Sequence, residues 1–381
     1  MRERKPVEVY PPGEFVKDEL DARGWAQGDL AEILGRPARL VNELISGKRG
    51  ITPETAKGLA KAFGTSAEFW MNLESAYQLH SNQSVHDVVE RRALLFSKAP
   101  IRAMIRRSWI EASDNIEVLE DSVRSFFNVA SIGDDFSFAP FAARKSGSRA
   151  SLSLEQNAWL FRALQLSKAA PGGVYSKSKI PQVLAQLQPL LSDAAEIRKV
   201  PQVLAVNGIR FVVVEALPQS KIDGATFWLK NTPVVALSLR YDRIDYFWYT
   251  LMHELGHVKN EDGRENDNIA FDVDLEADRD KREGDYEYAA DRFASEYLVS
   301  KVALDDFVAR VRPLYSRSKI IGFANRMGVH PGLVVGQIHY RERNYSHFRE
   351  FLVKVRDIIT SAALSDGWGS PFPAPAFVEE A

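Results

Sequence analysis

The chain has 381 residues, enough for two or three domains, and its 45% hydrophobic and 26% charged residues are typical of a folded protein. With 49 basic and 51 acidic side chains the net charge is −2, which excludes a wholly basic nucleic-acid binder. The absence of cysteine excludes disulfides, cysteine-ligated metals and thiol nucleophiles. No apolar run is long enough for a membrane helix and no secretory signal is visible, so we expect a cytoplasmic protein without a membrane partner.

Residues 12–79 are predicted to form five short helices with clear start and stop signals. The second begins near Gln27 and the third follows almost at once, with Pro37 in its first turn, so the pair has the helix-turn-helix arrangement. The fourth begins after Thr52 as N-cap and ends at Gly64. The third helix is expected to bury one apolar stripe, Leu40, Val41, Leu44 and Ile45.

The opposite, polar side of this third helix is predicted to bind double-stranded DNA. Arginine pairs twice with guanine and asparagine with adenine, and the free N–H groups at a helix N-terminus suit a phosphate. The alternative is a small helical bundle with ordinary surface charges. The expected base contacts are Arg36, Ala38, Arg39 and Asn42, and the expected phosphate contacts are Gln27, Lys48 and Arg49.

Residues 11–73 resemble the XRE/Cro repressor family, and in particular its HigA-type antitoxin branch. The sequence ISGKRGITPETAKGLAKAFGTSAEFW at residues 45–70 carries much of the resemblance. It implies a homodimer bound to two-fold operator DNA. The chain departs from the family at Pro37-Ala38, where the third helix usually begins with more polar residues. This departure leaves base reading mainly to Arg36, Arg39 and Asn42.

The middle of the chain, residues 80–205, is predicted to be mainly helical, with helices in 85–112, 116–128, 154–168 and 180–197. Residues 133–151 are rich in glycine and serine, and we expect a linker or a loop that contacts nucleic acid. Further on, residues 261–296 have a net charge of −9 and residues 310–356 one of +8. Such segments either serve different partners or dock on each other.

From residue 208 the hydrophobic pattern becomes that of strands. Ile209–Val214, Ala225–Leu229 and Val234–Leu239 are rich in β-branched and aromatic residues and are predicted to form a small antiparallel sheet. The sheet edge near the last of these runs could accept an extended strand of a protein substrate. A helix is predicted to follow from about Arg243 to Val258.

This helix carries the sequence His253-Glu254-Leu255-Gly256-His257. Residues four apart share one face of a helix, so both imidazoles can bind one Zn²⁺ ion, with Glu254 beside the open position of the metal. Glu254 is then placed to accept a proton from the attacking water and to deliver it to the leaving amine. The alternative is an amphipathic helix with two surface histidines.

A third protein ligand is needed, and the third histidine of metzincins is absent because position 263 is glycine. We therefore expect a carboxylate from residues 261–296. Glu287 is the best candidate because it lies on a second predicted helix, one turn before Asp291. Asp291 could orient a zinc-bound histidine through its free N–H. The alternative for Glu287 is a solvated glutamate in an acidic run.

Residues 208–340 resemble the ImmA/IrrE family of zinc metallopeptidases, a gluzincin-like group. The matching sequences are FWYTLMHELGHV at 247–258, EYAADRFASEYLV at 287–299 and IIGFANRMGVHPGLVVGQIHY at 320–340. The family pattern E-x-x-A-[ND]-x-F-A supports Glu287 as the third ligand. The resemblance implies cleavage of a repressor-type protein. The chain departs from the family at Val299-Ser300, where Met-Pro is frequent.

The expected protein is multidomain, with an all-α helix-turn-helix domain before a mainly helical α+β gluzincin-like metallopeptidase domain that contains the small antiparallel sheet. The expected divisions are a DNA-binding domain at 1–80, a helical connection at 81–205, a zinc peptidase core at 206–310 and a basic helical extension at 311–381. Tyr246, Tyr249 and His330 are candidates for stabilising an oxyanion, and none is assigned.

These patterns favour a transcriptional regulator that hydrolyses a peptide bond in a repressor or toxin–antitoxin partner. The competing expectation is a non-proteolytic antitoxin and autorepressor, which neutralises a toxin by binding and keeps its metal site for stability. A third is a repressor whose affinity for DNA is tuned by zinc.

Overall fold

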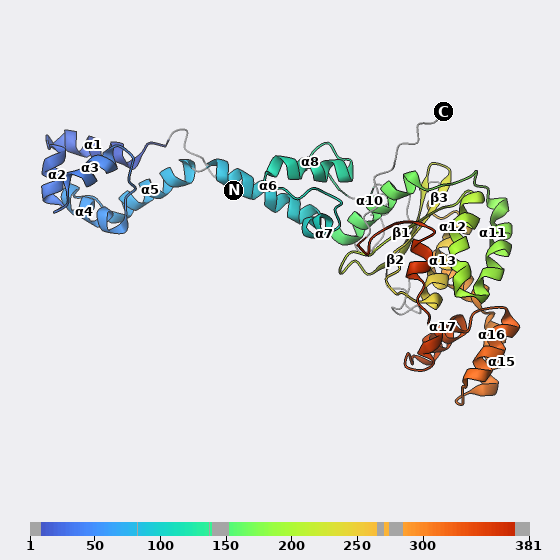
Figure 1. The fold of residues 1–381 in the computed structure, drawn as a ribbon. Helices are drawn as coiled ribbons and strands as arrows, with labels where there is room; N and C mark the ends of the chain where they lie inside the picture. The colour runs from blue at the N-terminus through green and yellow to red at the C-terminus, as the bar shows by residue number, and fades with distance from the viewer. Residues whose placement is uncertain are drawn as a thin grey trace. The chain divides into compact units, whose positions relative to one another are not determined.

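The computed structural model describes residues 9–81, 83–136, 138, 152–264, 270–273 and 285–369. The chain divides into two compact units, Met1–Ala93 and Leu94–Ala381 (Figure 1). Among the described helices, none is long and apolar enough to cross a membrane. Most of the predicted loop at 133–151, and residues 265–269 and 274–284 of the acidic segment, lie outside the described residues.

The first unit contains the five predicted helices. Thr52 accepts a hydrogen bond from the backbone N–H of Thr55, which confirms it as an N-cap, and Gly64 ends the fourth helix in the left-handed conformation. Pro37 is the N-cap of the third helix rather than part of its first turn, because its ψ of 139° is extended. The helices are α1 (Pro12–Arg23), α2 (Gln27–Ile33), α3 (Ala38–Ile45), α4 (Pro53–Phe63) and α5 (Ala67–Ser81), and α6 (Gln83–Lys98) includes the division between the units.

One small hydrophobic core joins α1 to α5. Val41 and Leu44 of α3 are buried in it, and Leu40 and Ile45 are partly buried, so the apolar stripe of α3 faces inward as predicted. Trp70 of α5 is fully buried, and its indole N–H donates to the Thr65 hydroxyl at 2.8 Å. The helix-turn-helix is therefore held from behind by α4 and α5, and its polar side is left in water.

In the described part of the second unit, helices lie before a single sheet and between its strands. Two predicted helices are shorter than expected: the one at 85–112 is interrupted at Pro100, and the one at 180–197 ends at Leu187 before two short 3-10 turns, η2 (Gln188–Ser192) and η3 (Ala194–Lys199). Before the sheet lie α7 (Ile101–Arg106), α8 (Ile116–Phe127), α10 (Leu154–Ala169), α11 (Ile180–Leu187) and α12 (Val200–Val206). Between its third and fourth strands lies α13 (Ile244–Asn260). Between its fourth and fifth strands lie α14 (Asp285–Leu298), α15 (Lys301–Val311), α16 (Arg317–Met327), α17 (Pro331–Glu342) and α18 (Arg356–Thr360).

Within the described residues the sheet has five strands in the order β4-β2-β3-β1-β5, and it is mixed rather than antiparallel. The pairs β2–β3 and β2–β4 are antiparallel, whereas β1 is parallel to β3 and to β5. The connection at 215–221 is long enough to carry the chain past one strand position, which β3 then fills. The strands are β1 (Arg210–Val214), β2 (Ile222–Leu229), β3 (Thr232–Leu237), β4 (Ala270–Val273) and β5 (Leu364–Asp366).

Because β3 lies between β2 and β1, it offers no free edge. The expectation that a substrate strand adds near Val234–Leu239 is therefore wrong. The two edges of the sheet are β4 and β5. β5 is fixed to the body of the unit through Asp366, whose carboxylate accepts the indole N–H of Trp109 at 3.1 Å and pairs with Arg162.

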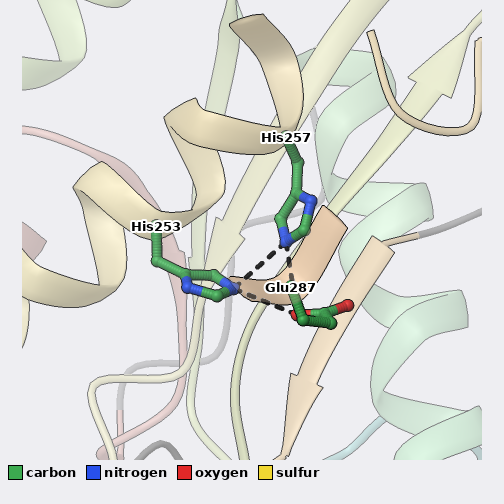
Figure 2. A group of neighbouring side chains, drawn as sticks. All are labelled: His253, His257 and Glu287. Atoms are coloured by element: carbon green, nitrogen blue, oxygen red, sulfur yellow. Dashed lines mark hydrogen bonds and ion pairs between the residues drawn. The ribbon is translucent and has the colours of Figure 1, made fainter. Parts of the chain in front are cut away.

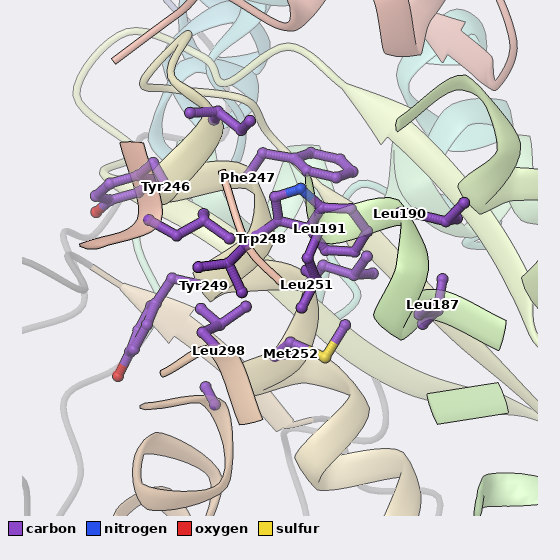
Figure 3. Close-up of a cluster of buried hydrophobic side chains, with 14 of the residues drawn as sticks. Leu187, Leu190, Leu191, Tyr246, Phe247, Trp248, Tyr249, Leu251, Met252 and Leu298 are labelled. Carbon is purple, nitrogen blue, oxygen red and sulfur yellow. The ribbon is translucent and has the colours of Figure 1, made fainter. Parts of the chain in front are cut away.

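Helix α13 is the centre of the larger core. Every residue from Ile244 to Val258 is buried, so the alternative of two surface histidines is wrong. One side of α13 packs on β2 and β3, and α14 and α17 pack against other sides. Figure 3 shows Trp248, Leu251 and Met252 of α13 beside Leu187 and Leu191. Helix α17, which belongs to the predicted basic extension, packs in the same core.

The basic segment 310–356 forms ion pairs with several acidic neighbours. Arg310 pairs with Asp306 on α15, and Arg341 on α17 pairs with Asp305. Further ion pairs of this segment join Arg356 to Asp242, Arg312 to Glu342 and Arg317 to Glu350. These pairs join the helices of the segment to one another and to the start of α13.

Candidate metal centre and nucleic-acid interface

His253 and His257 point from one side of α13 toward the same place, as Figure 2 shows. Both side chains are fully buried, and their Nε2 atoms are 3.1 Å apart. The helix period places residues four apart above one another, so one turn of α13 supplies both imidazoles. The apolar residues between and around them anchor this turn in the core.

Glu287 of α14 completes the group from 30 residues further along the chain. Its Oε2 atom lies 3.4 Å from Nε2 of His253 and 3.6 Å from Nε2 of His257. One ligand atom from each residue lies within 4.8 Å of the others, and all three residues are buried. Ligand atoms around one tetrahedral zinc ion are about 3.4 Å apart when the bonds are about 2.1 Å. Two imidazoles and a carboxylate at these separations fit such an ion.

The close approach of α14 to α13 depends on Gly256. A β-carbon at this position would lie 3.0 Å from Cα of Ala290 and 3.3 Å from the ring of Phe293. Because Gly256 has no side chain, the backbones of the two helices come near enough for Glu287 to reach the histidines. Ala290 and Ala294 of α14 are fully buried against the same contact.

Each histidine contacts a second carboxylate through its other ring nitrogen. Nδ1 of His253 lies 3.0 Å from Asp291, which also accepts the hydroxyl of Tyr249 at 2.6 Å. Nδ1 of His257 lies 2.8 Å from Asp262. Such contacts fix the tautomer of an imidazole and turn its Nε2 toward a metal. Sequence reasoning anticipated Asp291 but missed Asp262, although its place directly after the end of α13 was a usable signal.

The electrostatics of the group favour a cation. Burial alone would lower the pKa of His257, but its hydrogen bonds to Asp262 and Glu287 outweigh burial and raise the pKa to about 9. Burial would raise the pKa of Glu287, but hydrogen bonds with His253 and His257 hold it well below its ordinary value. Three carboxylates thus surround two imidazoles in a buried space, which suits a bound metal ion.

Glu254 faces β2 rather than α14. It is fully buried, and its Oε2 accepts a hydrogen bond from the Thr226 hydroxyl at 2.7 Å. Gly224 allows this contact, since a β-carbon there would lie 2.5 Å from Oε1 of Glu254. Thr226 and Gly224 were not among the residues expected from the sequence. A threonine and a glycine within an otherwise apolar strand were the available signal.

The three oxyanion candidates each make another contact. The hydroxyl of Tyr246 donates to Asp223 at 3.1 Å, and that of Tyr249 donates to Asp291. Nδ1 of His330 accepts the backbone N–H of Gly332 and caps the N-terminus of α17. Tyr249 therefore acts on the group through Asp291, and no role in oxyanion binding is assigned to the other two.

In the first unit, all seven residues expected to contact DNA are exposed. Gln27 is the first residue of α2, and Lys48 and Arg49 follow the end of α3. The others lie at or on α3, namely Arg36, Ala38, Arg39 and Asn42. The candidate residues thus lie at the start of α2, on the exposed side of α3 and in the turns on either side of α3.

Acidic side chains lie among these candidate residues. Glu43 accepts a hydrogen bond from Nε of Arg39 at 2.7 Å and lies 3.8 Å from Arg49. Arg36 pairs with Glu54. The nearly buried carboxylate of Glu74 accepts the backbone N–H of Ile51 at 2.8 Å, which fixes the end of the turn that carries Lys48 and Arg49. Sequence reasoning identified neither Glu43 nor Glu74 as a neighbour of these candidate residues.

One family model matches part of each unit. The helix-turn-helix family matches residues 16–70. Antitoxin HigA-1 of Vibrio cholerae is 39% identical over 77 residues, which are 20% of this chain and 70% of that protein. Virulence-associated protein I of Dichelobacter nodosus is 34% identical over 83 residues, 20% of this chain and 77% of that protein. The chain belongs to the HigA-like helix-turn-helix family. All seven candidate DNA contacts lie within its helix-turn-helix domain.

A second family, the IrrE N-terminal-like domain of peptidase family M78, matches residues 208–335. The match contains His253, Glu254, His257, Glu287 and Asp291. The chain is thus a HigA-like helix-turn-helix protein with an M78 peptidase-like domain, and the expected family resemblance is confirmed for both parts.

Solved structures of HigA proteins are similar to about a fifth of the chain. A HigA-family antidote protein from Coxiella burnetii is 35% identical and covers 22% of this chain and 94% of its own, with a TM-score of 0.21. The Pseudomonas aeruginosa antitoxin HigA, solved with the higBA promoter, is 36% identical and covers 21% of this chain and 88% of its own, also with a TM-score of 0.21.

Proposed function

We propose that the protein is a DNA-binding regulator whose second unit is a zinc-dependent endopeptidase acting on a regulatory partner protein, either a repressor or a component of a toxin–antitoxin pair. The observation that carries the proposal is the meeting of His253, His257 and Glu287 in a buried space with separations of 3.1 to 3.6 Å. The M78 family match supports it.

The three residues would hold the ion, and Asp291 and Asp262 would keep the two imidazoles oriented. Two histidines, one carboxylate and an open position are a ligand set of catalytic zinc. Bound zinc would supply Lewis acidity, polarising the carbonyl of the scissile peptide bond. The surrounding carboxylates make the site selective for a cation over a neutral ligand.

Glu254 is the proposed general base and acid. Its carboxylate would accept a proton from the water that attacks the carbonyl carbon, and would then pass this proton to the leaving nitrogen as the C–N bond breaks. The hydrogen bond from the Thr226 hydroxyl holds the Glu254 carboxylate against β2. Burial excludes bulk water from the proton path.

The helix-turn-helix domain would bring the protein to operator DNA as a homodimer. Arg36, Arg39 and Asn42 would contact base edges with Ala38 beside them, and Gln27, Lys48 and Arg49 would contact phosphates. The curated relatives support this part, since one is an antitoxin and another, from Escherichia coli and 29% identical over 84 residues, is an HTH-type transcriptional regulator. Work on operator DNA would place the protein in the cytoplasm.

The test replaces the proposed base and keeps everything else. The Glu254→Gln variant should retain zinc and DNA binding, while hydrolysis falls about 10²- to 10⁴-fold, the range of one general acid–base group. Zinc content is measured by mass spectrometry. Cleaved substrates are identified by new protein N-termini that appear in cells producing the wild-type chain and are missing from cells producing the variant. Equal sets of new N-termini in the two strains would contradict the peptidase proposal.

A second candidate is a non-proteolytic antitoxin that binds a toxin and represses its own promoter. It is favoured by the 39% identity to HigA-1, an antitoxin of which 70% is matched by 77 residues of this chain. It predicts that the Glu254→Gln variant protects cells as well as the wild type does. A loss of protection in this variant, with zinc and DNA binding retained, would favour the peptidase.

A further inference from the structure

The outer edge of β2 is the strand edge nearest to Glu254. Thr226 donates a hydrogen bond to the Glu254 carboxylate, and Gly224 lies in contact with it. On its inner side β2 pairs with β3 from Gly224 to Leu229. The opposite edge of the sheet, at β5, is separated from β2 by β3 and β1. Among the described strands, a peptide that pairs with the sheet beside Glu254 must therefore do so at the outer edge of β2.

That edge is already covered by the chain itself. β4 runs antiparallel to β2, with Ala270 opposite Thr226, Phe271 opposite Ala225 and Asp272 opposite Gly224. Two of these β2 residues, Gly224 and Thr226, are the ones that lie against Glu254. The backbone groups that could bind an extended peptide at this place are paired with β4 instead, so peptide and β4 compete for one position.

β4 is less firmly paired than the other neighbour of β2. It consists of four residues, and its register shifts between Ile222 and Gly224, which interrupts the ladder. The β2–β3 ladder has six consecutive pairs without such a shift. Short edge ladders open at low free-energy cost, whereas central ladders open only with the whole unit. Replacement of β4 therefore leaves the rest of the sheet intact.

We propose that β4 is an internal strand that occupies the peptide-docking edge of β2, and that the partner of this surface is an extended segment of a protein, which binds by replacing β4. The proposal rests on the proposed peptidase function and adds a substrate class. Segments that can become extended over about four residues would be bound, and folded helices would not. Until such a segment arrives, β4 covers the approach to Glu254.

The test locks β4 in place with a disulfide. The chain has no cysteine, so an Ala225→Cys/Phe271→Cys variant contains a single pair of thiols. These residues face each other across the ladder, where β-carbons are about 5 Å apart, near the separation a disulfide needs. Side chains alternate along a strand, so position 225 lies on the face of β2 opposite to Gly224 and Thr226 and away from Glu254.

Binding is measured on metal-free protein with fluorescein-labelled β-casein, an unfolded protein, as the probe. The reduced variant should bind β-casein. The oxidised variant should bind it at least about tenfold more weakly, because the locked β4 prevents the peptide from pairing with β2. With zinc added, oxidation should slow β-casein cleavage by a similar factor, and reduction with a phosphine should restore it. Equal binding in the two redox states overturns the proposal, and so does failure of the thiols to join under oxidation.

The matched control is a Leu229→Cys/Thr232→Cys variant, which links β2 to β3 at the end of their hairpin. Its binding and cleavage should not depend on redox state, and a dependence equal to that of the first variant would overturn the role of β4. Failure of the peptidase function appears separately, as absence of cleavage by zinc-loaded wild-type protein. The binding comparison on metal-free protein decides the role of β4 in that case too.

Discussion

The two units place their candidate functional residues in opposite environments. In the helix-turn-helix domain, the seven candidate DNA contacts are exposed and come from one stretch of 23 residues, Gln27 to Arg49. In the second unit, His253, Glu254 and His257 are fully buried, and Glu287 comes from another helix. Changes on the first surface should alter binding and leave folding intact, whereas the buried group depends on how α13, α14 and β2 pack.

The largest expected effect comes from removing one ligand of the buried group. The His257→Ala variant should lose its zinc and its hydrolytic activity, because two remaining ligands bind zinc weakly. Affinity for DNA should stay within about twofold, because the helix-turn-helix has a hydrophobic core of its own in the other unit. Metal analysis measures the zinc content, and DNA mobility shifts measure the affinity for DNA. Loss of DNA binding together with zinc would instead favour a zinc-tuned repressor. His330→Ala, which removes only a helix cap, is the control that should keep zinc.

The next effect concerns the carboxylates behind the histidines. Asp291→Asn and Asp262→Asn should each lower zinc affinity about 10- to 100-fold, because the imidazoles lose their orienting partners. Competition with a chromophoric chelator measures this. Asp306→Asn, on the exposed part of α15, should have wild-type affinity. A wild-type affinity for Asp291→Asn would remove Asp291 from the site.

On the exposed surface, loss of a base contact and loss of a phosphate contact should have different effects on DNA binding. Arg39→Ala should weaken binding to a selected operator about 10-fold or more and relax base preference at one position, because a bidentate base contact is lost. Lys48→Ala should weaken binding to all sequences alike and reduce the slope of log affinity against log salt by about one. Titrations at several salt concentrations against specific and random DNA distinguish them. Identical profiles for the two variants would refute the assignment.

The smallest effect is expected at Glu43. Its carboxylate holds Arg39 and lies near Arg49, so Glu43→Gln removes a negative charge from the surface and frees both arginines. Binding to random DNA should tighten about twofold while preference for the operator falls, as expected of an exposed pair. Glu68→Gln on α5 is the charge-matched control. An unchanged preference in Glu43→Gln would show that Arg39 needs no orienting partner.

Local features were predictable from the sequence in both units. The N-cap at Thr52 and the stop at Gly64 are set by residues within one helical turn, and both were correctly anticipated. The same holds for the shared face of His253 and His257. The spacing of Glu287 and Asp291 on α14 led to the expectation that both lie near the histidines, and the structure brings them together there.

Features set by distant pairing were not predictable. The order of the strands depends on which strands pair with β1 and with β2, and hydrophobic runs alone do not specify these pairings. The contact between Thr226 and Glu254 joins a strand to a helix 28 residues away. Asp262 was one of many carboxylates in an acidic run, and only the end of α13 distinguishes it from the others.

The glycine inside the histidine motif has a consequence for engineering. Alanine is the better helix former by about 1 kcal/mol, so Gly256→Ala should strengthen α13 as an isolated helix. In the folded protein the added methyl group would press on Ala290 and move α14, and Glu287 with it, away from the imidazoles. Gly256→Ala replaces no ligand, yet it could stabilise α13 and at the same time weaken binding of the ion. At residue 256, helix stability therefore favours alanine and ion binding favours glycine.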